Sequence, residues 1–91
     1  MKYEIVPSNQ FKKDLILAQK RGYALEKIKK VIATLANGET LDAKYRDHLL
    51  TGDYGGYREC HIQPDWLLVY QIDGDQLILF LARTGTHSDL F

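Results

Sequence analysis

The three histidines of this chain are its residues best suited to proton transfer, because imidazole titrates near neutral pH. His48 lies in a segment without regular periodicity, His61 closes an expected strand, and His87 lies beyond the last expected strand. Asp65 follows His61 in a turn, and Arg83 ends the last expected strand. A folded chain of this length has a radius of gyration of about 12 Å, so these side chains could share one cleft.

Such a group of side chains suits cleavage of a phosphodiester bond without a metal ion. One imidazole can accept the proton of a ribose 2′-hydroxyl, a second can protonate the leaving 5′-oxygen, and a guanidinium can stabilise the charged phosphorane. The attacking hydroxyl exists in RNA and not in DNA, which indicates RNA as the substrate. Each correctly placed acid or base typically contributes about 10²- to 10⁴-fold in rate.

The same side chains permit other interpretations. The histidines and Asp65 are possible metal ligands, although their spacing lacks the close pairs typical of zinc sites. Taken singly, His48 is typical of a solvated loop residue, and Asp65 after Pro64 is a common turn residue. Trp66 would open a buried strand, and Arg83 would be an ordinary charge at the end of a strand. From the residues alone, catalysis, metal binding and a structural role are all open.

Length and composition predict one globular domain. The chain has 91 residues, of which 45% are apolar and 26% charged, with two prolines and seven glycines. This composition excludes disordered, collagenous and low-complexity classes. The longest apolar runs are far shorter than the roughly 18 residues of a membrane span, and the N-terminal residues lack a signal-peptide pattern. With a single cysteine, Cys60, we expect a cytoplasmic protein without a disulfide or membrane contact.

The net charge of zero conceals an uneven distribution. Residues 1–46 contain ten Lys and Arg against five acids, whereas residues 47–91 contain two against seven. The first half therefore has five more positive than negative charges, and the second half has the reverse. A basic half can bind phosphate or an acidic protein, and the same lysines are also typical of solvated helix faces.

The first half of the chain has the pattern of a strand followed by a helical hairpin. Alternation predicts a strand over Lys2–Val6, after which Ser8 can cap a helix over Asn9–Arg21. Gly22 is a suitable helix stop, and a second helix is expected over Ala24–Asn37. Apolar residues recur three or four positions apart in both helices, at Phe11, Leu15, Ala18, Leu25, Ile28, Ile32 and Leu35.

The second half has the pattern of an antiparallel meander. Residues 39–56 have no sustained period and are expected to form a long connecting loop. Strands are expected at 57–62, 66–72 and 76–83, and 84–91 is expected to be a frayed tail or a functional arm. We therefore predict a small α+β domain. Its helical hairpin covers one sheet face, so the other face must be covered by the loop, the tail or a partner.

Two stretches of the sequence carry specific motifs. KYRDHLLTGDYGGYRECHIQPDWLLVYQI, beginning at Lys44, contains DHxLxG and YRxxHxxPDW, and LARTGTHSDLF contains RTGTHxxLF. With the order of the elements, these stretches resemble YafQ-type toxins of the RelE/ParE toxin–antitoxin superfamily over essentially the whole chain. The resemblance implies a RelE-like fold for residues 1–91.

The resemblance also implies roles for individual residues. Cleavage is associated with the motif residues His48, His61, Asp65 and His87. Trp66 and Phe91 match aromatic positions that are needed for activity, where stacking on a base is a reasonable role. Arg83 matches the arginine of RTGTH and would be the phosphate-stabilising cation. Glu59, two residues before His61, is an additional candidate.

The function implied by this resemblance is that of an mRNA interferase, an endoribonuclease that cleaves translated mRNA in the ribosomal A site without a cofactor. A cognate antitoxin would silence it, and the two proteins would bind operator DNA together. The main alternative is a non-catalytic ParE-like toxin that inhibits gyrase on the same scaffold. A further alternative is a plain interaction module. Three histidines favour the nuclease, because the resemblance to the ParE-like group does not include this set of histidines.

Overall fold

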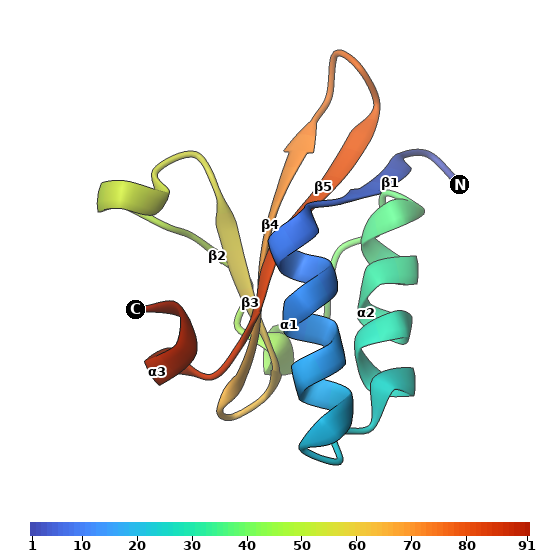
Figure 1. The fold of residues 1–91 in the computed structure, drawn as a ribbon. Helices are drawn as coiled ribbons and strands as arrows, with labels where there is room; N and C mark the ends of the chain where they lie inside the picture. Colours follow the sequence, from blue (N-terminus) through green and yellow to red (C-terminus); the bar gives the residue numbers. More distant parts are fainter.

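A mixed five-stranded sheet with two helices on one face forms the frame of the computed structural model, which describes residues 1–91 (Figure 1). The elements are β1 (Glu4–Pro7), α1 (Asn9–Lys20), α2 (Leu25–Ala36), the 3-10 helix η1 (Ala43–Tyr45), β2 (His48–Leu49), the 3-10 helix η2 (Gly52–Tyr54), β3 (Arg58–Gln63), β4 (Trp66–Asp73), β5 (Ile78–Gly85) and α3 (His87–Leu90). The strand order is β1-β5-β4-β3-β2, with β1 parallel to β5 and the other neighbours antiparallel. The predicted α+β class is confirmed.

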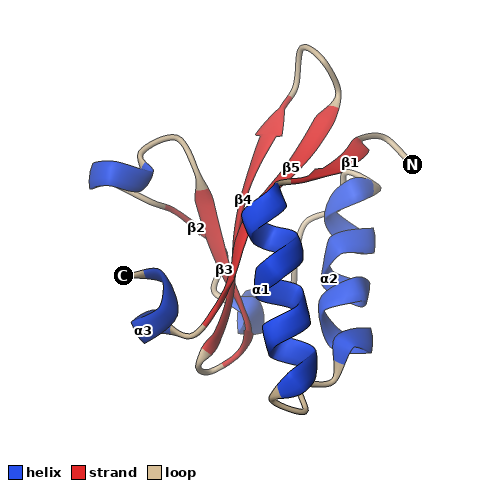
Figure 2. Ribbon diagram, viewed as in Figure 1, coloured by secondary structure: helices blue, strands red, loops and turns tan.

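The helical hairpin forms as the sequence predicts. The Ser8 side chain accepts a hydrogen bond from the Phe11 amide and caps α1. Gly22 has a φ of 82°, a left-handed conformation that lets the chain turn into α2 at little cost. The apolar faces of both helices pack against β3, β4 and β5 and enclose the main core. Figure 2 shows both helices on the same face of the sheet.

The sheet face opposite α1 and α2 is covered by the chain itself. Leu67 and Val69 of β4 pack there against Leu90 of α3. Tyr54 and Tyr57, from the segment between β2 and β3, complete this smaller cluster. The prediction that the loop or the tail covers this face is therefore confirmed, and both of them contribute.

Two segments differ from the expectation. Residues 39–56 are not only a loop, because they contain two short 3-10 helices and the edge strand β2, which pairs with β3. A strand of two exposed residues has no alternation that a sequence pattern could reveal. The tail is not frayed, because Thr86 and Asp89 form a capping box that opens α3.

The remaining bounds agree with the prediction to within two residues. The start of β1 and both ends of β5 shift by two residues, and β5 begins at Ile78 instead of residue 76. Leu77 adopts a left-handed φ of 56°, and the Asp73 side chain accepts hydrogen bonds from the amides of Asp75 and Gln76. The turn before β5 is therefore longer than the sequence pattern indicates. No helix in the structure has the length and apolar character needed to cross a membrane.

Candidate active site

A buried carboxylate between two imidazoles forms the centre of the site. His48 of β2 lies opposite Glu59 of β3, and His61 lies two residues farther along the same strand face. The Glu59 Oε1 atom is 3.6 Å from His48 Nε2 and 3.5 Å from His61 Nε2. The Glu59 side chain is only 5% exposed. A buried carboxylate needs polar partners, and the two imidazoles lie where they can supply them.

The third histidine comes from the C-terminal helix. The ring of His87 lies 5.9 Å from that of His61, and the ring of His61 lies 6.4 Å from that of His48, measured between centroids. His61 therefore lies between the other two. The prediction that the three histidines of a loop, a strand end and a tail come together is confirmed.

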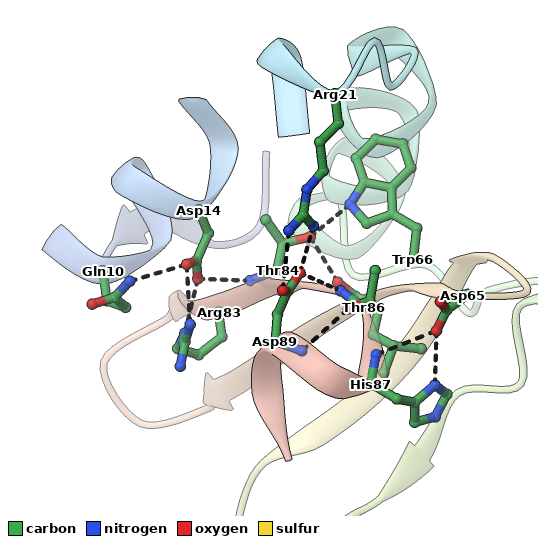
Figure 3. Close-up of polar contacts among 11 residues, drawn as sticks. Gln10, Asp14, Arg21, Asp65, Trp66, Arg83, Thr84, Thr86, His87 and Asp89 are labelled. Atoms are coloured by element: carbon green, nitrogen blue, oxygen red, sulfur yellow. Dashed lines mark hydrogen bonds and ion pairs between the residues drawn. The ribbon is translucent and has the colours of Figure 1, made fainter. Parts of the chain in front are cut away.

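Asp65 holds His87 from the turn between β3 and β4, as Figure 3 shows. Its Oδ1 atom accepts a hydrogen bond from the His87 amide at 3.3 Å and lies 3.1 Å from Nδ1 of the ring. This contact lowers the pKa of Asp65, chiefly through the hydrogen bond from the His87 side chain. The ring is held through Nδ1, so its Nε2 atom is left for proton transfer.

Arg21 and Asp89 fix the position of α3, and sequence reasoning missed both residues. Arg21, at the C-terminal end of α1, donates to Asp89 Oδ2 at 2.6 Å and to Oδ1 at 3.2 Å (Figure 3). The same carboxylate accepts from the Thr86 amide at 2.9 Å. The hydrogen bond from Arg21 lowers the pKa of Asp89. A Cβ at Gly85 would lie 2.8 Å from Asp89 Oδ2, so this approach requires glycine.

Trp66 does not have the predicted role of a base-stacking platform. Its side chain is 1% exposed, and its ring packs against Tyr23 at 4.9 Å between centroids. The indole Nε1 donates to Thr84 Oγ1 at 2.9 Å (Figure 3). This hydroxyl donates in turn to the Leu67 carbonyl at 2.7 Å. A base cannot reach a ring buried in this way. Trp66 instead holds Thr84, which lies near the end of β5 and three residues before His87.

Arg83 is not an unpaired cation beside the histidines. Its guanidinium donates to both carboxylate oxygens of Asp14 on α1, at 2.8 and 3.1 Å. Asp14 is buried and also accepts from the Thr84 amide, so this pair forms part of the contact between α1 and β5. The hydrogen bond with Asp14 raises the pKa of Arg83. The predicted contact of Arg83 with phosphate would require it to exchange this partner.

Phe91 lies where an aromatic contact with substrate is possible. Its side chain is 59% exposed. The ring is 6.3 Å from the His87 ring and meets Tyr54 edge-on at 5.2 Å. Unlike Trp66, it presents an accessible aromatic surface next to the histidines.

The position of His48 depends on a second polar network. Asp47 accepts hydrogen bonds from the Tyr70 hydroxyl at 2.5 Å and from Arg58 at 3.3 Å. Tyr70 is buried in the central strand β4, and burial is the main cause of its raised pKa. The Nδ1 atom of His48 lies 2.7 Å from the Arg46 carbonyl. These contacts anchor a strand that is only two residues long.

The metal-binding alternative takes a different form from the predicted one. The ligand atoms of Glu59, His61 and His87 lie within 4.8 Å of one another. The sequence predicted the three histidines and Asp65 as ligands. In the structure, Glu59 joins His61 and His87 instead of His48 and Asp65. Two imidazoles and one carboxylate are a reasonable ligand set for Zn²⁺ or Cu²⁺, so the residues fit a transition metal.

Comparison with known proteins places the chain in a family. The "mRNA interferase toxin YafQ" of Escherichia coli strain K12 is 45% identical over 89 residues, which cover 97% of this chain and 95% of that protein. A crystal structure of the E. coli DinJ-YafQ complex contains a chain with a TM-score of 0.89 and 42% identity, with 98% of each chain covered. A metal-bound toxin from Helicobacter pylori has a TM-score of 0.92 and 46% identity, and both chains are covered completely.

The family model that matches describes a bacterial toxin of a type II toxin–antitoxin system, YafQ, and it spans residues 3–91. The matched span contains all three histidines, Glu59 and Asp65. Sequence, fold and motifs agree in this assignment, and the chain therefore belongs to the YafQ family of type II toxins.

Proposed function

We propose that this protein is an mRNA interferase that cleaves translated mRNA in the ribosomal A site and thereby inhibits translation. The observation that carries the proposal is the row of three histidines with Glu59 buried between two of them. Inhibition of gyrase, the alternative activity on this scaffold, does not require imidazoles at such spacing.

The proposed reaction needs only proton transfer and positioning. A ribose 2′-oxygen attacks the adjacent phosphorus, and its proton passes to His48 or His61, whose imidazolium Glu59 stabilises. The bond between phosphorus and the 5′-oxygen breaks, and His87 gives the leaving oxygen its proton. Asp65 orients the His87 ring for this step. The products are a 2′,3′-cyclic phosphate and a 5′-hydroxyl.

We expect cleavage to depend on the ribosome, because the protein alone binds RNA too weakly. With a net charge of zero, the chain has too little positive surface for strong binding to free RNA. A ribosome that presents the codon would convert cleavage into a nearly intramolecular step. Sequencing of RNA 5′ ends in induced cells should place the cuts in reading frame. Equal cleavage of naked RNA would exclude the dependence on ribosomes.

The proposed partner is a cognate antitoxin, and the site of action is the cytoplasm, where ribosomes translate. One related toxin has been solved in a DinJ-YafQ complex. We propose that an acidic antitoxin segment docks on the basic helical hairpin and that the resulting complex, not the free toxin, binds operator DNA. Co-purification with the product of the neighbouring gene, with loss of cleavage in the complex, would support this partner. Full activity in a stable complex would contradict it.

Replacement of Phe91 by alanine should lower cleavage while the fold remains stable. Its ring is mostly exposed, so the core loses little, whereas the stacking of one base is worth about 1–3 kcal/mol. The expected loss in the rate constant kcat/KM is therefore about 5- to 150-fold. Leucine at the same position should restore little, because it lacks an aromatic face. A variant that melts much lower than the wild type would instead assign Phe91 to the apolar cluster.

A bound transition metal should inhibit the proposed cleavage. Zn²⁺ or Cu²⁺ held by Glu59, His61 and His87 would occupy the ring nitrogens that the reaction needs for protons. Titration calorimetry should detect binding to the wild type and a much weaker affinity in Glu59→Gln. Addition of EDTA should restore cleavage to the metal-treated toxin. Loss of cleavage on addition of EDTA would show that the reaction itself requires a metal.

A further inference from the structure

A basic groove runs from the histidines toward the helical hairpin. We define it by Lys27 and Lys30 of α2, Lys44 of η1, and Arg46, with half-buried Tyr23 and Tyr45 as further lining residues. Its volume is about 780 Å³. The lining includes four cations and a single carboxylate, that of Asp65, which is already bonded to His87. The groove is therefore strongly attractive to an anion.

Arg46 differs from every other arginine of the chain. Arg21 is paired with Asp89, Arg58 with Asp47, and Arg83 with Asp14. The fourth arginine, Arg46, has no carboxylate partner, and it lines the basic groove. Three cations thus serve the fold, whereas Arg46 is available to a ligand. A guanidinium is also the side chain best matched to the geometry of phosphate.

The groove is continuous with the candidate active site. His61 and Asp65 line the groove, and His61 also contacts Glu59 and Asp65 contacts His87. Arg46 adds a direct link, because its backbone carbonyl lies 2.7 Å from Nδ1 of His48. Arg46 holds this carbonyl in place with a left-handed φ of 50°, which is uncommon for a residue other than glycine. An RNA strand whose scissile phosphate lies among the histidines can therefore continue into the groove.

We propose that the basic groove binds the phosphodiester backbone of the mRNA on one side of the scissile phosphate, with Arg46 as its main contact. This inference rests on the proposed function. It assigns to Arg46 the contact with phosphate that was predicted for Arg83. Phe91, which lies beside His87 and does not line the groove, would then hold a base, so that the RNA is bound both by stacking and by charge.

The test compares two variants that remove the same charge. Arg46→Gln combined with Lys30→Gln removes two of the four cations of the groove, and Lys12→Gln combined with Lys13→Gln removes two exposed lysines of α1 outside it. Binding is measured on ribosomes whose A site holds a codon with a 2′-deoxy nucleotide at the cleaved position, which blocks the reaction. A second set of ribosomes carries mRNA that ends before the A site.

The groove variant should bind codon-containing ribosomes at least tenfold more weakly than the wild type, and the control variant should bind within about twofold. The salt dependence of binding should also weaken, by about 0.7 in the log–log slope for each phosphate that the variant no longer neutralises. On ribosomes without an A-site codon, the groove variant and the wild type should bind equally.

Three results would overturn the inference. An equal loss of affinity on both sets of ribosomes would mean that the groove contacts ribosomal RNA. A loss of antitoxin binding with unchanged affinity for the codon would mean that it holds an acidic peptide. Unchanged binding throughout would mean that it holds neither. Failure of the proposed function is a separate result, since it would appear as a wild-type toxin that does not cleave on ribosomes with an ordinary codon.

Discussion

Replacement of His87 by alanine should lower mRNA cleavage on ribosomes by about 10²- to 10⁴-fold, the usual contribution of one general acid. The melting temperature should change little, because the side chain is 55% exposed and its partner Asp65 is also mostly exposed. Ser88→Ala, an exposed neighbour in the same short helix, is the matched control and should keep both activity and stability.

The pH dependence of cleavage gives a second readout for this variant. If His87 supplies the proton to the leaving oxygen, the wild-type rate should fall at alkaline pH as the acid form is depleted, and that limb should disappear in the variant. Retention of cleavage near the wild-type rate would refute the assignment of His87 as the general acid. A strong fall in the melting temperature would instead place His87 among the residues that hold α3.

Most of the fold was predictable because its signals come from residues that are close together in the sequence. Ser8, Gly22 and the apolar spacing of the two helices act locally, so their signals are complete within a few residues. The pairing of β1 with β5, in which Ile5 lies opposite Leu79, has no such signal. It depends on which sheet edge remains open once the hairpin covers one face, and a single sequence does not contain that information.

The candidate site also has a part that the sequence predicted and a part that it did not. The three histidines were identifiable by type, and their position outside both helices predicted that they share one cleft. The contacts that hold them were not identifiable: Arg21 and Asp89 are 68 positions apart, and ordinary charged residues give no sign of their partner. Trp66 shows the opposite case. Its place at the start of an apolar strand indicated a core residue, and the structure agrees with that pattern instead of the stacking role implied by the resemblance.

Replacement of Trp66 by alanine should cost about 3–5 kcal/mol of folding free energy, the usual range for a large buried aromatic. The variant would lose the packing against Tyr23 and leave Thr84 without its indole donor. Since small domains have only about 5–15 kcal/mol of stability in total, this loss is a large fraction of it, and the melting temperature should fall strongly. Denaturation with urea, followed by circular dichroism, measures this loss directly.

Trp66→Phe separates a structural role from contact with RNA. Phenylalanine keeps most of the buried surface and removes the indole N–H, while Thr84 retains its hydrogen bond to the Leu67 carbonyl. The expected cost is about 1–3 kcal/mol, and cleavage should stay within about threefold of the wild type at a temperature where the variant is folded. Phe91→Ala should show the reverse, with nearly full stability and weak cleavage. A folded Trp66→Phe variant with a hundredfold weaker cleavage would mean that the indole does reach the substrate, through an opening of the core that the present structure does not contain.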